Sequence, residues 1–100
     1  MAQAALTEAV FYILLSLIEP MHGYGIMQNV EKLSGGRVRL AAGTLYGALN
    51  TLLEKGWIAE CETGVMGRKK EYLATETGKS AAREELLRLQ ELVTNGKALL

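Results

Sequence analysis

The segment from Ala41 to Ile58 constrains the fold more than any other part of the chain. Its leucines recur at the i, i+4, i+7 and i+8 spacing of one helix face, namely Leu45, Leu49, Leu52 and Leu53. Lys55-Gly56 then predicts the end of a helix, because a cation suits the last carbonyls and glycine accepts a positive φ. We therefore expect a helix over residues 42–55 that buries its leucine face.

The opposite face of this predicted helix is small and nearly uncharged, with Thr44, Gly47, Ala48 and Thr51. A surface helix usually carries long charged side chains there. Glycine inside a helix also costs about 1 kcal/mol relative to alanine, so Gly47 calls for a packing or functional reason. Small residues let a helix backbone lie close to a flat or grooved surface, and this face is therefore a candidate contact surface.

Two strands are predicted directly after this helix, over residues 57–63 and 68–74, with Gly64 and Gly67 in the turn between them. Basic residues gather at the end of this hairpin, at Arg68, Lys69 and Lys70. A helix followed at once by a basic hairpin is the arrangement of a winged helix-turn-helix, in which the second helix of the pair enters the major groove.

The residues upstream supply the remaining elements of that arrangement. Thr7 is predicted to cap a helix that runs to Glu19, before Pro20, and a second helix is expected over residues 23–33. Residues 37–40 are expected to form a short strand that pairs with the hairpin. The predicted fold class is therefore mainly α with a small β-hairpin.

Charge is zero over the whole chain but uneven along it. The segment 37–70 holds six basic residues and three acidic ones, an excess of +3, where a DNA-facing surface would lie. Ordinary scatter of charge is the alternative. Arg37 and Arg39 either contact phosphate or form a solvated edge.

The last predicted helix, over residues 76–99 with Thr75 as its cap, repeats apolar residues at spacings of 4, 3 and 4, at Ala82, Leu86, Leu89 and Val93. Such a stripe can pair across a two-fold axis or fold back on its own domain. Val10 and Leu14 belong to a first helix that is apolar nearly all round, which indicates a second buried side. We expect a DNA-binding unit over 1–75 and a dimerisation helix over 76–100, in one compact unit.

No constellation of catalytic or metal-ligating residues is visible. His22 is the single histidine and is interpreted as a turn or capping residue, and Cys61 is the single cysteine, with packing favoured over a redox role. The apolar run over residues 10–18 is too short to span a bilayer, and the N-terminus lacks the basic start of a signal peptide. We expect no enzyme activity, no cofactor, no metal, no membrane association and a cytoplasmic location.

Four segments in this order resemble the PadR family of bacterial transcriptional regulators, namely PMHGYGI at 20–26, GTLYGAL at 43–49, LEKGWI at 53–58 and YLATETG at 72–78. The resemblance extends from about Leu6 to Leu92. It implies a repressor that binds a palindromic operator as a homodimer.

The resemblance also identifies Tyr46 as a DNA-contacting position. The full set of DNA-binding candidates is Arg37, Arg39, Thr44, Tyr46, Gly47, Ala48, Asn50, Thr51, Arg68, Lys69 and Lys70. Asn50 and Thr51 depart from the family, which often has Lys or Arg there, and Gly47 stands where proline is frequent. These differences weaken the expected phosphate contacts of the helix and leave more to the wing.

The chain resembles the short members of the family, which have a single C-terminal helix. In some of these relatives an apolar cavity between the subunits binds flat lipophilic effectors. Here the last helix has no aromatic residue, and Phe11 and Tyr12 are the candidate substitutes, unless they only fill the core. The competing function is a winged-helix module whose third helix contacts a protein instead of DNA.

Overall fold

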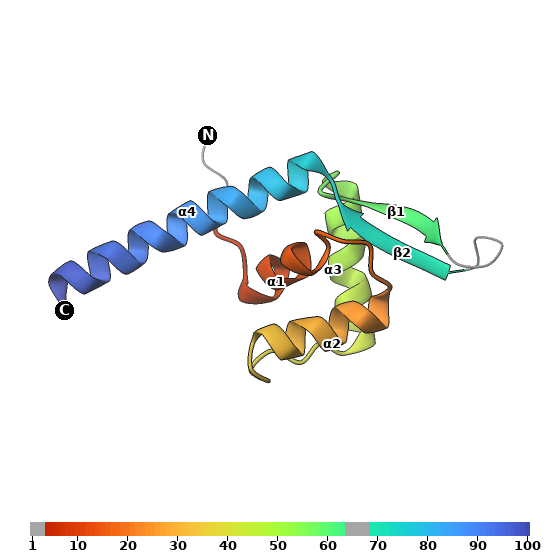
Figure 1. The fold of residues 1–100 in the computed structure, drawn as a ribbon, viewed down its shortest axis with the longest axis horizontal. Coiled ribbons are helices and arrows are strands. Elements are labelled where there is room, and N and C mark those ends of the chain that lie inside the picture. Colours follow the sequence, from red (N-terminus) through yellow and green to blue (C-terminus); the bar gives the residue numbers. More distant parts are fainter. Residues whose placement is uncertain (1–3, 64–68) are drawn as a thin grey trace.

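The computed structural model describes residues 4–63 and 69–100. Within them the element order is α1 (Glu8–Ser16), α2 (Gly23–Leu33), α3 (Ala42–Glu54), β1 (Ile58–Thr63), β2 (Lys69–Ala74) and α4 (Glu76–Leu99). In Figure 1 the hairpin extends from one side of the three-helix cluster and α4 projects from the other, over a longest dimension of 56 Å. The predicted fold class, a winged helix-turn-helix with a long terminal helix, is confirmed.

The core lies where α1, α2 and α3 meet. Its fully buried side chains are Ile13, Leu14, Leu17, Ile26, Val30, Leu45 and Leu49. Two polar groups join α1 to α2 inside this cluster: Asn29 donates to the Ser16 hydroxyl, which itself donates to the Tyr12 carbonyl, both at 2.8 Å. The leucine face predicted for residues 42–55 is therefore the face that α3 buries.

Threonine side chains cap α1 and α4 as predicted. Thr7 accepts a hydrogen bond from the Val10 amide and Thr75 accepts one from the Gly78 amide, each at 3.1 Å. α1 ends at Ser16, earlier than the predicted Glu19. The Leu17 carbonyl instead accepts a hydrogen bond from the Ala74 amide of β2 at 2.8 Å. The residues after Ser16 are therefore bonded to the hairpin and do not continue the helix.

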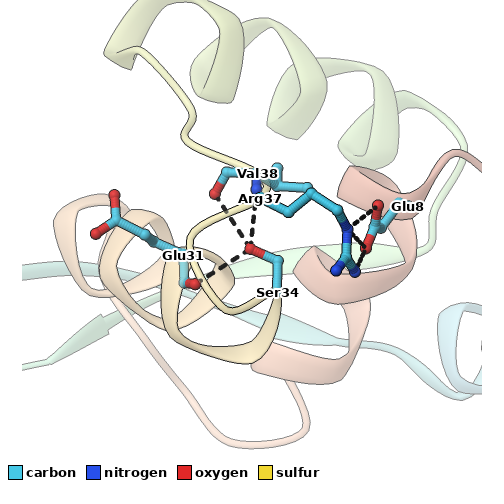
Figure 2. Close-up of polar contacts among 5 residues, drawn as sticks. All are labelled: Glu8, Glu31, Ser34, Arg37 and Val38. Atoms are coloured by element: carbon cyan, nitrogen blue, oxygen red, sulfur yellow. Dashed lines mark hydrogen bonds and ion pairs between the residues drawn. The ribbon is translucent and has the colours of Figure 1, made fainter.

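The hairpin is antiparallel, with Ile58 opposite Ala74 and Glu60 opposite Tyr72. Met21 lies beside β2 and exchanges two backbone hydrogen bonds with Tyr72, at 3.1 and 2.9 Å. The prediction of a short strand over residues 37–40 is wrong. Ser34 accepts from the Val38 amide at 2.9 Å, as Figure 2 shows, and this local bond removes a donor that strand pairing would need.

α4 has two halves with different surroundings. The first half packs on the domain and buries Gly78, Ala81, Ala82 and Glu85. A Cβ at Gly78 would lie 2.8 Å from the Trp57 carbonyl carbon, so only glycine allows this close approach to the start of the hairpin. The second half projects away from the domain (Figure 1) and exposes Leu86, Leu87, Leu92 and Val93.

Candidate DNA-binding surface

The face of α3 opposite the buried leucines is open. Thr44, Tyr46, Gly47, Asn50 and Thr51 are all exposed. A Cβ at Gly47 would meet no atom within 4 Å, so no packing inside the chain requires glycine there. The small residues of α3 thus present a surface on which another backbone or a groove edge can approach closely.

Ala48 and Thr51 stand at the edge of that surface. Ala48 is half-buried and packs on the core cluster. Both residues line a cleft of about 270 Å³, and Val10 and Trp57 line the same cleft. Lys55 lies at the same end of α3, with its Nζ 4.8 Å from the centre of the Trp57 ring, a cation–π contact. The centre of the open face is therefore Gly47 and Asn50.

Tyr46 crosses from α3 to the first turn of α2. A Cβ at Gly23 would lie 2.8 Å from the Tyr46 Cζ atom, so the ring occupies the space that any other residue at 23 would need. The side chain stays 46% exposed. Sequence reasoning identified Tyr46 but missed Gly23, because only the fold brings the two together.

His22 caps α2. Its Nδ1 accepts a hydrogen bond from the Gly25 amide at 3.0 Å, which confirms the predicted capping role. The first turn of α2, with the positive end of its dipole, thus lies beside the Tyr46 ring. No group of three or more His, Cys, Asp or Glu side chains within residues 4–63 and 69–100 could hold a metal ion.

The two candidate arginines between α2 and α3 are already paired with carboxylates. Arg37 makes a two-pronged contact with Glu8 at the start of α1, as Figure 2 shows. The Arg37 hydrogen bonds lower the pKa of Glu8, and the Glu8 carboxylate raises the pKa of Arg37. Arg39 lies 3.5 Å from Glu31. Both guanidinium groups remain largely exposed, so the pairs are screened by solvent.

The wing is described only in part. Lys70 is 58% exposed at its side chain and lies 3.9 Å from Glu60, a loose ion pair. Arg68 lies outside the described residues, and of Lys69 only the backbone, at the start of β2, is described. The phosphate clamp predicted from these three residues stays a prediction.

The residues predicted for dimerisation fall into two groups. Leu14 is 1% exposed and Ala82 is 7% exposed, and both belong to the chain's own core. They present almost no surface to a partner, so the proposed interface does not include them. Leu86 and Val93 are about half exposed on α4, and Val10 and Leu89 are partly buried.

Phe11 and Tyr12 belong to α1 and line a cleft against α4, and the centres of their rings are 6.3 Å apart. They line this cleft of about 310 Å³ together with Leu89, the buried Glu85 and its partly exposed partner Arg88. Sequence reasoning missed Glu85: the i, i+3 spacing to Arg88 was visible, but the burial of the carboxylate was not.

A helix pair, an open second helix and an adjoining hairpin define a winged helix-turn-helix, a class of DNA-binding protein. A model of the transcriptional regulator PadR-like family matches residues 12–84, most of the chain. The chain belongs to the PadR-like family of transcriptional regulators and is a DNA-binding regulator of that family.

Solved structures agree with this assignment. A PadR family regulator from Eggerthella lenta is 25% identical, covers 90% of this chain and 79% of its own, and superposes with a TM-score of 0.72. A regulator from Thermoplasma acidophilum is 26% identical, with 91% and 88% covered and a TM-score of 0.71. PadR of Bacillus subtilis in complex with operator DNA is 22% identical, with 78% and 45% covered and a TM-score of 0.64.

No curated protein matches the chain significantly. No helix within the described part of the chain is long and apolar enough to cross a membrane.

Proposed function

We propose that this protein is a sequence-specific repressor that binds a palindromic operator as a homodimer. The observation that carries the proposal is the open, small-residue face of α3 centred on Gly47, which nothing in the described part of the chain covers or requires. A PadR of Bacillus subtilis that shares the fold has been solved with operator DNA, which supports the same use of the face here. The proposed place of action is the cytoplasm.

The open face suits a major groove. Asn50 can pair with an adenine through its amide, Thr44 and Thr51 can contact bases or phosphates, and Gly47 allows close approach. The Tyr46 hydroxyl, beside the first turn of α2, is suited to a phosphate oxygen. Because Arg37 and Arg39 are paired with carboxylates, the phosphate contacts of the wing, from Lys70 with Arg68 and Lys69, carry more of the salt-dependent affinity.

The proposed homodimer uses the second half of α4. An open hollow of about 560 Å³ on this helix is lined by Leu86, Leu89 and Val93, and Leu89 also lines the α1–α4 cleft. The two hollows share Leu89, and in this proposal the apolar side chains along them form a strip on which a second copy of α4 packs. Full burial of a leucine contributes about 1.5–3 kcal/mol, so several of these residues can hold two chains together. In this proposal residues 1–75 bind DNA and 76–100 dimerise.

The α1–α4 cleft is also the proposed site for a small apolar effector. Phe11 and Tyr12 provide aromatic walls, and Leu6 and Leu89 add aliphatic surface. Since the partner helix would lie on the same strip, a ligand there can change how the two subunits pack and so release DNA.

The proposal is tested by selecting bound duplexes from a random DNA pool at two salt concentrations. A palindrome with half-sites about one helical turn, roughly 34 Å, apart is the expected product, with weaker binding at high salt. No enrichment over a scrambled pool, with or without candidate effectors, would contradict the proposal and favour a winged-helix module that contacts a protein.

A further inference from the structure

Glu85 is the only Asp, Glu, Lys or Arg that is buried among the residues whose side chains the structure describes, at 2% exposure. Arg88 donates to both of its carboxylate oxygens, from Nε at 2.9 Å and from Nη2 at 2.6 Å. The backbone of Leu6 lies close enough to lower the pKa of this carboxylate further. Burial of a charge is costly unless it is paired and hydrogen-bonded, and such groups fix one geometry where apolar contacts allow several.

The proximity of Glu85 to Leu6, in one cleft, brings together two segments that are distant in the sequence. Leu6 packs against the core and directly precedes Thr7, which caps α1. Glu85 is therefore packed where α4 meets the point at which the chain enters α1. The same four side chains, Leu6, Thr7, Glu85 and Arg88, line one cleft, so they lie together in space.

Glu85 is also the last buried residue of α4. Gly78, Ala81 and Ala82 are buried before it, whereas Leu86 and Leu87, which follow it, are 48% and 66% exposed. Arg88 and Leu89 still line the cleft with α1, and the rest of the helix projects away from the domain (Figure 1). The part from Glu85 to Leu99 is about 21 Å long at 1.5 Å per residue. Glu85 is thus the last buried contact of α4 before its projecting part.

We propose that Glu85 sets the direction of α4 and thereby the spacing between half-sites that the dimer accepts. This inference rests on the proposed homodimer, in which the second half of α4 holds the partner. A tilt of about ten degrees at Glu85 would move the far end of the helix by roughly 4 Å. Successive base pairs are about 3.4 Å apart, so such a tilt changes the separation of the two α3 helices on the scale of one base pair.

The first test needs no DNA. Cys61 is the only cysteine, so a spin label there gives one distance between the subunits of a dimer. The wild-type protein and the control Glu84→Gln, which changes an exposed neighbouring carboxylate, are expected to give the same narrow distribution. Glu85→Gln and Glu85→Leu are expected to shift or broaden it by about 4 Å, the displacement expected for a small tilt.

The second test measures affinity for duplexes in which the selected half-sites are moved apart or together by one or two base pairs. The wild-type protein is expected to lose affinity about tenfold or more at the wrong spacing. The affinity of Glu85→Gln is expected to vary only about threefold between the spacings. Circular dichroism checks that each variant is folded. If Glu85→Leu does not fold, the conservative variant Glu85→Gln alone is used for both tests.

The outcomes separate the two proposals. Unchanged distances and an unchanged spacing preference in folded Glu85 variants would overturn the role of Glu85 and leave the homodimer in place. A labelled wild-type protein without any intersubunit distance would overturn the homodimer and the role of Glu85 together.

Discussion

At the scale of single residues, the position of Tyr46 depends on the absence of a side chain at Gly23. The ring lies where a Cβ at residue 23 would be, 2.8 Å from the Tyr46 Cζ atom. The pair shows how α2 and α3 are joined at the surface as well as in the core. It also places the phenol, which is half exposed, next to the start of α2.

We therefore expect Gly23→Ala to displace the Tyr46 ring and to weaken operator binding about tenfold, a change of roughly 1.4 kcal/mol. Tyr46→Phe, which keeps the ring and removes the hydroxyl, separates the position of the ring from its hydrogen bond. Fluorescence anisotropy with a labelled operator measures both variants. Wild-type affinity in a folded Gly23→Ala protein would show that the Tyr46 ring has no part in binding.

The environment of Glu85 predicts how the stability of the fold changes as the pH falls. The Arg88 hydrogen bonds lower the pKa of Glu85 in the folded state, and the Leu6 amide lowers it further, against the effect of burial. A depressed carboxyl pKa stabilises the fold above the unfolded-state value of about 4.3, and this stabilisation is lost as pH falls through the lower folded-state value.

Thermal melts between neutral pH and about pH 3 check this expectation, since both pKa values lie within or below that window. The wild-type protein should lose stability as the pH falls below about 4.3, and Glu85→Gln should show a shallower loss. Glu84→Gln, at the exposed neighbour, should follow the wild-type curve. Parallel curves for the wild-type protein and Glu85→Gln would mean that this carboxylate contributes nothing to acid sensitivity.

At the scale of elements, the wing is the part that a DNA-binding function needs and a protein-binding surface does not. Of its three candidate cations, Lys70 is exposed and only loosely paired with Glu60. Removing one cation that neutralises a phosphate reduces the slope of log affinity against log salt by about one.

We expect Arg68→Ala, Lys69→Ala and Lys70→Ala combined to abolish operator binding at physiological salt, because all three candidate cations of the wing are then absent. Titrations over a range of salt concentrations measure the effect. Lys32→Ala and Lys79→Ala, which remove cations elsewhere, provide the control. Intact affinity and an unchanged salt slope in the triple variant would exclude the wing as a phosphate clamp.

The elements were also the level at which the sequence was most informative. The bounds of α2 and α4 coincide with the predicted ranges, residues 23–33 and 76–99. The strand at residues 37–40 was predicted wrongly, since alternation did not reveal that Ser34 binds the Val38 amide or that Met21 takes the place beside Tyr72. The pairing of Arg37 with Glu8 joins residues from two elements, which no local pattern predicts.

At the scale of the whole molecule, the chain exposes an apolar strip along the second half of α4 that its own domain does not cover. Leu86, Leu87, Leu92 and Val93 are each about half exposed or more. The heptad spacing predicted this stripe but not where along the helix it leaves the domain, so the buried Ala82 was grouped with the exposed leucines. The burial of Leu14 on α1 and of Ala82 on α4 depends on how the helices pack, which only the fold specifies.

Leu86→Glu with Val93→Glu is expected to convert a dimer to a monomer, because two charges would have to be buried in the interface. Light scattering coupled to size-exclusion chromatography measures the mass of the particle. Leu33→Glu, at an exposed apolar position on α2, is the matched control and should leave the mass unchanged. A variant that keeps the mass of two chains would exclude the second half of α4 as the dimer contact.

The open face of α3 is tested most directly by operator binding of Gly47→Glu and Gly47→Lys. A Cβ at Gly47 meets nothing within 4 Å and glycine is a poor helix former, so both variants should fold and melt at or above the wild-type temperature. If α3 lies in the major groove, Gly47→Glu should lose operator affinity about a hundredfold or more, while the cation of Gly47→Lys should be tolerated far better. Wild-type affinity in folded Gly47→Glu would show that this face of α3 does not bind DNA.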